Sequence, residues 1–260
     1  MARCRVNPIA DGNGQPVSTG KPAVTILHEL GDISAPWLAE QLRVHGLAVE
    51  VMSAADLDMA ARWEHRVDAA GASVAITLRD GRVLSSGDPR PIVNRLSFVP
   101  LDGMRATAGV DMGYAVQEMF ALYLSWLHAW PATVVNRPTP QGLCGNHRHP
   151  SVWRTLGARA GLPTRPWRQS DSDAPDQAWM WMPAEATAFA LGDEVVLAPI
   201  LPETFADGCR ALAALSDTAL IGIDFARDDA GEWEMIGATP LPNLMLGGEK
   251  LVSALAAALA

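Results

Sequence analysis

The sequence contains very little lysine: Lys21 and Lys250 are its only lysines. A P-loop needs a lysine to reach the nucleotide phosphates, and neither lysine stands in such a motif. No basic run occurs, and the net charge is −9, which excludes non-specific nucleic-acid binding because that needs clustered lysine and arginine. A nucleophile elbow and a dinucleotide fingerprint are absent as well.

Cysteines are also few, and long apolar runs are missing. Cys4, Cys144 and Cys209 are odd in number and far apart, which is not a disulfide framework, so we expect a reducing, cytoplasmic location. The C-terminal apolar stretch at 251–260 is too short to span a membrane. The first residues lack the apolar segment of a secretory signal. We therefore expect neither membrane nor nucleic-acid partners.

The chain has enough apolar material for a sizeable core. Its hydrophobic fraction is 49% and its charged fraction 19%, which is typical of a folded globular protein. A length of 260 residues allows one compact unit or two small lobes. Residues 1–21 are rich in Gly, Asn, Pro and Ser, and we expect them to form a flexible tail.

The order of apolar runs predicts an α/β fold. Strands at 23–27 and 47–51 flank a helical stretch at 35–45, and this βαβ unit predicts a parallel sheet. The other expected elements are hairpins at 72–84, 187–198 and 220–236, short strands at 91–94, 132–135 and 179–182, and helices at 114–130, 152–160, 203–215 and 248–260.

The most informative stretch is Ile221–Leu244, IGIDFARDDAGEWEMIGATPLPNL, which predicts two strands around a polar turn and then a loop with prolines. Asp224 is a lone charge on an apolar strand, and burying it costs free energy unless it finds a partner. This hairpin resembles the last part of the catalytic core of ATP-grasp carboxylate–amine ligases, whose strands hold the magnesium ions of ATP. The resemblance implies that Asp224 binds Mg²⁺ and that Arg227, Thr239 and Asn243 lie in the nucleotide site.

The first half is similar to the small α/β domain that precedes the ATP-grasp core in ribosomal-peptide maturases and glutamate-ligase-like proteins. It has an Asn-Arg pair at 94–95, an apolar helix at 114–130 and a strand that ends in Asn-Arg-Pro at 136–138. Gly145–Asn146 follows, and residues 189–195, FALGDEV, are similar to the hairpin that leads into the core. The resemblance rests on the order of these patches along the chain.

The sequence departs from the ATP-grasp pattern in the parts that bind nucleotide. The family's second strand ends in Glu-x-Asn before a proline, whereas this chain has Gly237–Thr239 before Pro240. Residues 168–186 contain no lysine and no glycine, so the family's phosphate-binding lysine and glycine-rich lid are missing from the expected place. We therefore expect an N-terminal parallel-sheet domain at 22–168 and a truncated ATP-grasp-like part at 169–260.

Glu234, on the second strand of the hairpin, is a second candidate metal ligand. It can share a metal with Asp224 only if the turn places both side chains on one face. The alternative is that Glu234 faces solvent and that Asp224 pairs with an arginine such as Arg227.

Two Asn-Arg pairs stand at predicted strand ends, where ligands bind in open α/β sheets. Arginine binds carboxylate or phosphate with a planar fork, so two pairs at one crevice would suit an anionic small molecule. The alternative is that each arginine braces a loop through local carbonyls. The candidate substrate-binding residues, with those of the following loop, are Asn94, Arg95, Asn136, Arg137, Asn146, His147 and Arg148.

Two further clusters allow both a functional and a structural interpretation. Cys144, His147 and His149 have metal-binding side chains, but no fourth ligand is evident, and a polar loop is the plainer interpretation. Trp179 and Trp181 alternate with methionines and could stack on a planar ring such as a pterin or adenine, or fill the core.

The resemblance implies a biosynthetic ATP-grasp-like protein, a carboxylate–amine ligase that joins an amine to an acyl phosphate made from ATP with Mg²⁺. Such proteins act in cofactor pathways, including those of pterin-type one-carbon carriers, and in peptide maturation. The missing ligands leave an alternative: a degenerate ATP-grasp protein that does not use ATP and binds an anionic metabolite or a peptide, or scaffolds a partner enzyme. Helix pairing between two chains would give a homodimer.

Overall fold

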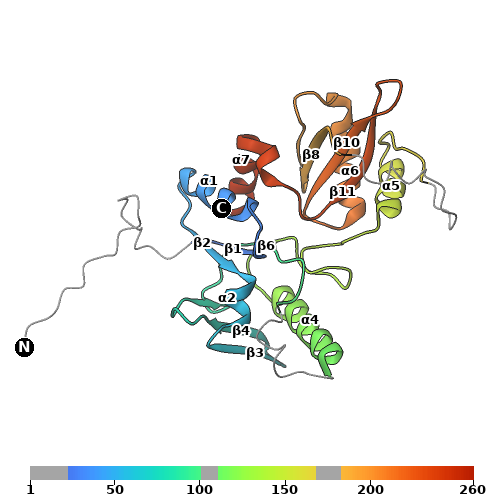
Figure 1. Ribbon diagram of the computed structural model, residues 1–260. Coiled ribbons are helices and arrows are strands. Elements are labelled where there is room, and N and C mark those ends of the chain that lie inside the picture. The colour runs from blue at the N-terminus through green and yellow to red at the C-terminus, as the bar shows by residue number, and fades with distance from the viewer. Residues whose placement is uncertain (1–22, 101–110, 168–182) are drawn as a thin grey trace, which may run out of the picture.

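The computed structural model describes residues 23–100, 111–167 and 183–260. These residues form a four-stranded parallel sheet, a four-stranded antiparallel sheet and a three-stranded antiparallel sheet, with helices between and around them (Figure 1). The predicted mixed α/β class is therefore confirmed. The expected strand with Trp179 and Trp181 lies outside the described residues. Among the described helices, none has the length and hydropathy needed to cross a membrane.

The parallel sheet begins with the predicted βαβ unit. Strands β1 (Val24–His28) and β2 (Val49–Ser53) pair in parallel, and α1 (Ser34–Val44) connects them. Strands β6 (Ile92–Arg95) and β7 (Val134–Val135) complete the order β2-β1-β6-β7. Most of β1 and all of β6 is buried, as expected for central parallel strands covered on both faces.

The three-stranded sheet lies on one side of the parallel sheet. It consists of β3 (Arg62–Asp68), β4 (Gly71–Thr77) and β5 (Val83–Ser85), and the short helix α2 (Ala54–Asp58) leads into it. The predicted turn between β4 and β5 is confirmed, whereas the sequence did not predict β3. Helix α4 (Met112–His128) packs against this sheet through buried aromatic side chains.

The antiparallel sheet forms the C-terminal part of the fold. Its strands are β8 (Ala186–Leu191), β9 (Glu194–Val196), β10 (Leu220–Arg227) and β11 (Trp233–Thr239), in the order β11-β10-β8-β9. Both predicted hairpins, β8–β9 and β10–β11, are present. Strand β10 is the longest and lies between β8 and β11, so its middle residues, 222–225, pair with a neighbouring strand on both sides.

Two helices cover one face of the antiparallel sheet. Helix α5 (Pro150–Arg159) packs on β11, and α6 (Ala206–Ser216), which follows the short 3-10 helix η3 (Glu203–Phe205), packs on β8 and β9. Alternate residues of β10, Ile223 and Phe225 among them, point into the core beneath these helices. The opposite face of β10 therefore carries the residues in between.

The closing elements join the two main sheets. The 3-10 helix η4 (Leu244–Gly247) and helix α7 (Gly248–Leu259) pack against α1, as Figure 1 shows for α7 beside α1. One buried cluster contains Leu38 of α1, Phe189 of β8 and Leu251 of α7. The parallel and antiparallel sheets thus share a continuous core, and the expected domain boundary near residue 168 stays a prediction.

Candidate functional site

Asp224 is a partly buried carboxylate of the antiparallel sheet. It lies in the middle of β10, on the face opposite Ile223 and Phe225. The hydroxyl of Thr187, directly across on β8, donates a hydrogen bond to Asp224 Oδ1 at 2.8 Å. Burial raises the pKa of Asp224, and the Thr187 bond opposes that rise only in part. A carboxylate kept in such a place at a cost to stability is typical of a functional position.

The residue opposite Asp224 on β11 is Gly237, the position at which the ATP-grasp resemblance expects a glutamate. A Cβ built on Gly237 would meet no heavy atom within 4 Å. A side chain would therefore fit here, and the glycine is not required by close packing. The pairing of β10 with β11 is irregular between Asp224 and Phe225, because β11 has an extra residue, Ile236, between their partners Gly237 and Met235.

Asp224 alone would supply one carboxylate ligand to a magnesium ion. Mg²⁺ usually binds through one or two carboxylates together with substrate phosphates, so Asp224 fits an ion that is shared with a nucleotide. No group of three His, Cys, Asp or Glu side chains that could hold a metal occurs in residues 23–100, 111–167 and 183–260. The described residues thus fit a shared magnesium ion but not a metal held by the protein alone.

Glu234 lies opposite Ala226 and therefore on the same face of the sheet as Asp224. The expectation that it faces solvent is wrong, because its Oε2 accepts a hydrogen bond from Arg165 Nε at 2.8 Å and its side chain is only 19% exposed. An arginine already neutralises this second candidate metal ligand. Its metal-binding role stays a prediction, since a metal would have to compete with Arg165.

Arg227 does not pair with Asp224 in the described part of the chain. Its guanidinium donates to the carbonyl of Gly231 and lies 4.4 Å from the centre of the Trp233 ring. The expected alternative of an Asp224–Arg227 ion pair is therefore wrong. Arg227 instead holds the β10–β11 turn, which leaves the Thr187 hydroxyl as the one hydrogen-bond donor to Asp224 that we find among the described residues.

Thr239 and Asn243 shape the loop that follows β11. The Thr239 hydroxyl accepts a hydrogen bond from the Leu241 backbone N–H at 3.1 Å. Asn243 Oδ1 accepts one from the Met245 N–H at 3.2 Å and thereby caps η4. Asn243 also accepts a bond from the Ser34 hydroxyl, at the start of α1. Both residues have local structural contacts, and their predicted nucleotide contacts stay predictions.

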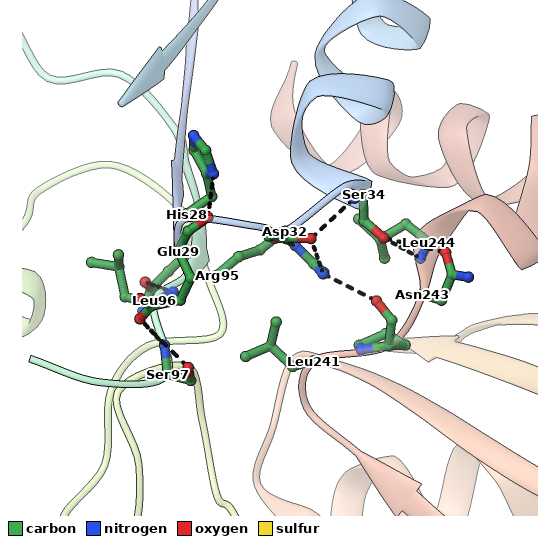
Figure 2. A network of polar contacts seen from close by, with 12 residues as sticks. His28, Glu29, Asp32, Ser34, Arg95, Leu96, Ser97, Leu241, Asn243 and Leu244 are labelled. Atoms are coloured by element: carbon green, nitrogen blue, oxygen red, sulfur yellow. Dashed lines mark hydrogen bonds and ion pairs between the residues drawn. The ribbon is translucent and has the colours of Figure 1, made fainter. Parts of the chain in front are cut away.

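The first Asn-Arg pair ends β6. Arg95 forms a two-pronged ion pair with Asp32, with Nε to Oδ2 at 2.6 Å, and donates a further bond to the Pro242 carbonyl at 3.2 Å (Figure 2). The side chains of Arg95 and Asp32 are only 5% and 9% exposed. Arg95 therefore ties the loop after β1 to the loop before η4, as in the alternative in which arginine braces loops.

Asn94 and Asn136 are buried amides at the seam between the sheets. Asn94 donates to the carbonyls of Asn136 and Leu143, at 2.9 and 2.6 Å. Asn136 donates to the carbonyls of Leu220 and Pro240, at 2.9 and 2.8 Å, and accepts from the Leu220 N–H at 2.7 Å. The backbone of Asn136 has φ of 61°, a left-handed conformation that asparagine tolerates. Asn136 thus fastens the start of β10 to the end of β7.

Arg137 caps the C-terminal end of α4. Its two terminal nitrogens donate to the carbonyls of four residues, two of which are Leu127 and Trp130. The Arg137 side chain also lines a cavity of about 490 Å³ between α4, the end of β7, the β8–β9 turn and α6. The other charged or imidazole side chains that line it are His128, Asp193, Arg210 and Asp217.

The loop before α5 holds the end of α6. Asn146, which is 6% exposed, donates to the Ser216 carbonyl at 2.8 Å, and Arg148 donates to the same carbonyl at 3.3 Å. His147 is exposed. Binding of an anionic substrate by this loop and by the two Asn-Arg pairs stays a prediction, because the recorded polar contacts of these residues are to protein atoms.

Cys144, His147 and His149 do not converge. Cys144 is buried, whereas His149 sits at the start of α5, where its Nδ1 accepts a hydrogen bond from the Ser151 N–H. This is the polar-loop interpretation of the segment. Sequence patterns did not indicate Thr187, Arg165 or Asp32 as partners, because none of them stands in a motif and each contacts a residue far along the chain.

No protein-family model and no curated protein matches this chain. Among solved structures, the macrocyclase MdnC bound with precursor peptide MdnA from Microcystis aeruginosa MRC is similar, with 11% identity, a TM-score of 0.67, and 91% of this chain and 98% of that chain covered. The ATP-grasp ligase PsnB complexed with a phosphomimetic variant of a minimal precursor, Mg and ADP has 13% identity, a TM-score of 0.65, and coverage of 92% and 98%.

A Chryseobacterium gregarium RiPP-associated ATP-grasp ligase in complex with ADP and a leader and core peptide is similar as well. It has 10% identity and a TM-score of 0.63, with 91% of this chain and 96% of that chain covered. At such low identities the likeness establishes the fold. The chain therefore has the fold of ATP-grasp ligases, over nearly its whole length.

Proposed function

We propose that this protein acts in peptide maturation, as a ligase that uses Mg-ATP to join a carboxylate and an amine on a peptide substrate. The main support is the fold, which is similar over 91% of the chain to a macrocyclase bound with its precursor peptide. Similar structures of PsnB were obtained with Mg and ADP. Fold alone does not assign a reaction, so the site has to carry the rest of the argument.

Asp224 is the residue that supports nucleotide use. It is a partly buried carboxylate on a central strand, at the position where the ATP-grasp resemblance places a magnesium ligand. A magnesium ion bound there with ATP would supply charge neutralisation at the transferring phosphate. Asp224 would hold the ion through its carboxylate, and Thr187 would orient that carboxylate through the bond to Oδ1.

The cavity beside Arg137 offers a place for part of the peptide. Its volume of about 490 Å³ is in the range of small-ligand pockets, and its lining combines small apolar residues with polar residues and with charged residues of both signs. Ala219, which lines the cavity, precedes β10, and Asp224 follows five residues later, about 17 Å along an extended strand.

A second candidate function is peptide binding without ATP. Gly237, opposite Asp224, favours it, because the space for a second carboxylate is present and the side chain is not. The ion pair of Glu234 with Arg165 also favours peptide binding without ATP, because the Arg165 guanidinium stands where a metal ion would neutralise Glu234. In this case the chain would be a degenerate ATP-grasp protein that presents or scaffolds a peptide.

The thermal midpoint with and without Mg-ATP separates the two candidates. A ligand that binds only the native state at a hundred times its Kd adds about 2.7 kcal/mol of stability, which raises the midpoint by roughly 5–10 °C in a chain of this size. The ligase predicts such a rise in wild type, dependent on magnesium, and a much smaller one in Asp224→Asn. A wild-type midpoint that is the same with and without millimolar Mg-ATP would refute the ligase and leave the nucleotide-free peptide binder.

A further inference from the structure

Two successive backbone N–H groups after β6 form an anion-binding concavity. The N–H groups of Ser97 and Phe98 both point at Glu29 Oε1, each at 2.9 Å, and the Ser97 hydroxyl lies 3.4 Å from the same oxygen. Consecutive N–H groups that converge on one oxygen are a general device for binding carboxylates and phosphates. We call Ser97 and Phe98 the N–H nest. Here a carboxylate of the protein itself fills it.

The nest lies where open α/β sheets bind ligands. Glu29 follows β1 and Ser97 follows β6, and these neighbouring parallel strands end at the same edge of the sheet. Figure 2 shows Glu29 and Ser97 together at this edge, with the ion pair of Arg95 and Asp32 beside them. Arg95 Nε and Nη2 are already bonded to Asp32 and to the Pro242 carbonyl. Among the described residues, the nest is therefore a second anion-binding group at this edge.

The nest is accessible and has an apolar rim. Leu30, next to Glu29, is 70% exposed, and Phe98 is 75% exposed. Glu29 is partly exposed, and in the described part of the chain its Oε2 receives no hydrogen bond. A carboxylate that replaced Glu29 would find the same donors, and one attached to an apolar group could contact the two exposed side chains.

The charge of Glu29 in the nest affects the pKa values of two buried side chains, Tyr123 and Cys144. Burial raises the pKa of Tyr123, and the charges of Asp58 and Glu29 raise it further. The Tyr123 hydroxyl is buried and has no hydrogen-bond partner in the described part of the chain. Burial also raises the pKa of Cys144 to about 12, and Glu29 is among the charges that act on it. The carboxylate in the nest therefore lies close enough to these two buried groups to affect their pKa values.

We propose that the N–H nest is a carboxylate-binding subsite and that Glu29 is its resident occupant, which a ligand carboxylate next to an apolar group displaces. The exchange is close to neutral in hydrogen bonding, because one carboxylate replaces another on the same donors and Glu29 moves into water. That the carboxylate belongs to a peptide rests on the proposed function. The subsite itself does not, and a free carboxylate metabolite would use the same donors.

Vacating the nest tests the subsite directly. Glu29→Ala removes the occupant and leaves the donors, so sodium acetate should restore stability. At acetate ten times above its Kd we expect the midpoint to rise by about 3–6 °C more than in sodium chloride of the same ionic strength. Wild type and Glu29→Gln, whose nest stays filled, should show no such excess. If Glu29→Ala does not fold, Glu29→Ser vacates the nest equally.

A matched control separates the nest from general salt effects. Glu185 Oε1 accepts one backbone bond, from the Arg227 N–H, so Glu185→Ala leaves a single donor and should gain nothing from acetate. Equal gains in all variants would mean that acetate acts on the whole surface, and the proposal would fall. The assay contains neither ATP nor peptide, so its failure is distinct from failure of the proposed ligase.

Calorimetric titration tests displacement and distinguishes the ligand sources. N-acetyl-leucine, a carboxylate beside an apolar side chain, should bind Glu29→Ala at least tenfold more tightly than wild type, because the internal competitor is gone. N-acetyl-leucinamide, which lacks the carboxylate, should bind neither protein. Tighter binding of N-acetyl-leucine than of acetate supports a peptide end; similar affinities support a small free carboxylate. Equal affinity of N-acetyl-leucine for wild type and variant would overturn the displacement by a ligand.

Discussion

Replacement of Asn136 should loosen the seam between the parallel and antiparallel sheets. Its side-chain amide makes three hydrogen bonds, two to the backbone groups of Leu220 and one to the Pro240 carbonyl. The residue is 2% exposed, so water does not replace these bonds. Its backbone is left-handed, with φ of 61°. Alanine would lose the bonds and strain the backbone, whereas glycine would lose only the bonds.

The two losses have different sizes. Each buried neutral hydrogen bond contributes about 1 kcal/mol, so removal of three costs about 3 kcal/mol in either variant. Alanine in a left-handed conformation costs about 1 kcal/mol more. We therefore expect Asn136→Gly to lower the free energy of unfolding by about 3 kcal/mol and Asn136→Ala by about 4 kcal/mol. In a chain of this size these losses lower the midpoint by roughly 6–16 °C.

Urea unfolding followed by circular dichroism measures both values, with Gln141→Ala as the control. Gln141 is exposed on the same loop, and its side chain makes no bond across the seam among the described residues. A loss of less than about 1 kcal/mol in the free energy of unfolding of both Asn136 variants would refute the claim that Asn136 holds the two sheets together, since three buried bonds cannot contribute so little. A glycine variant less stable than the alanine variant would refute the backbone argument.

Three further predictions address the other site residues. Arg137→Ala should lower stability by about 2 kcal/mol in urea unfolding, because the carbonyls at the end of α4 lose a charged donor, and an unchanged value would show that water replaces it. Asp224→Asn should raise the midpoint at pH 7, because burial raises the pKa of Asp224 in the folded protein. The free energy of unfolding of the wild type therefore falls as the pH rises from about 3.8 through the folded pKa, and the variant should lack this fall. A parallel pH dependence in both proteins would contradict it. Gly237→Glu should gain a midpoint rise in millimolar MgCl₂ that wild type lacks, because a second carboxylate then lies beside Asp224. No gain would contradict the pairing of these two positions.

Local sequence patterns predicted most of the fold. Asp80-Gly81 marked the turn between β4 and β5, and Gly81 has the positive φ of 88° that such a turn requires. The long apolar run that became α4 was equally clear. Strand β3 was missed because its sequence, RWEHRVD, alternates charged residues on an exposed edge and lacks an apolar run. Its pairing partner, β4, supplies the apolar face.

The polar partners of the site could not be predicted in the same way. Asp224 was visible as a lone charge on an apolar strand, but Thr187 lies 37 positions away and Arg165 lies 69 positions from Glu234. Arg95 and Asp32 are separated by 63 positions. A single sequence has periodicity over one helix or strand, and no periodic signal relates side chains that meet only after the sheets have packed.

The asparagines that resembled ligand-binding positions instead explain how Asp224 is placed. Asn94 bonds to the backbone of Asn136, Asn136 bonds to Leu220, and Asn146 bonds to the backbone at the end of α6, just before Leu220. These buried amides determine where β10 starts relative to the parallel sheet, and Asp224 follows four residues later on the same strand. A motif at a strand end can therefore position a neighbouring strand through buried hydrogen bonds. Substitution of Asn136 should lower stability and leave the affinity for Mg-ATP nearly unchanged while the protein stays folded, whereas Asp224→Asn should lower that affinity while stability rises.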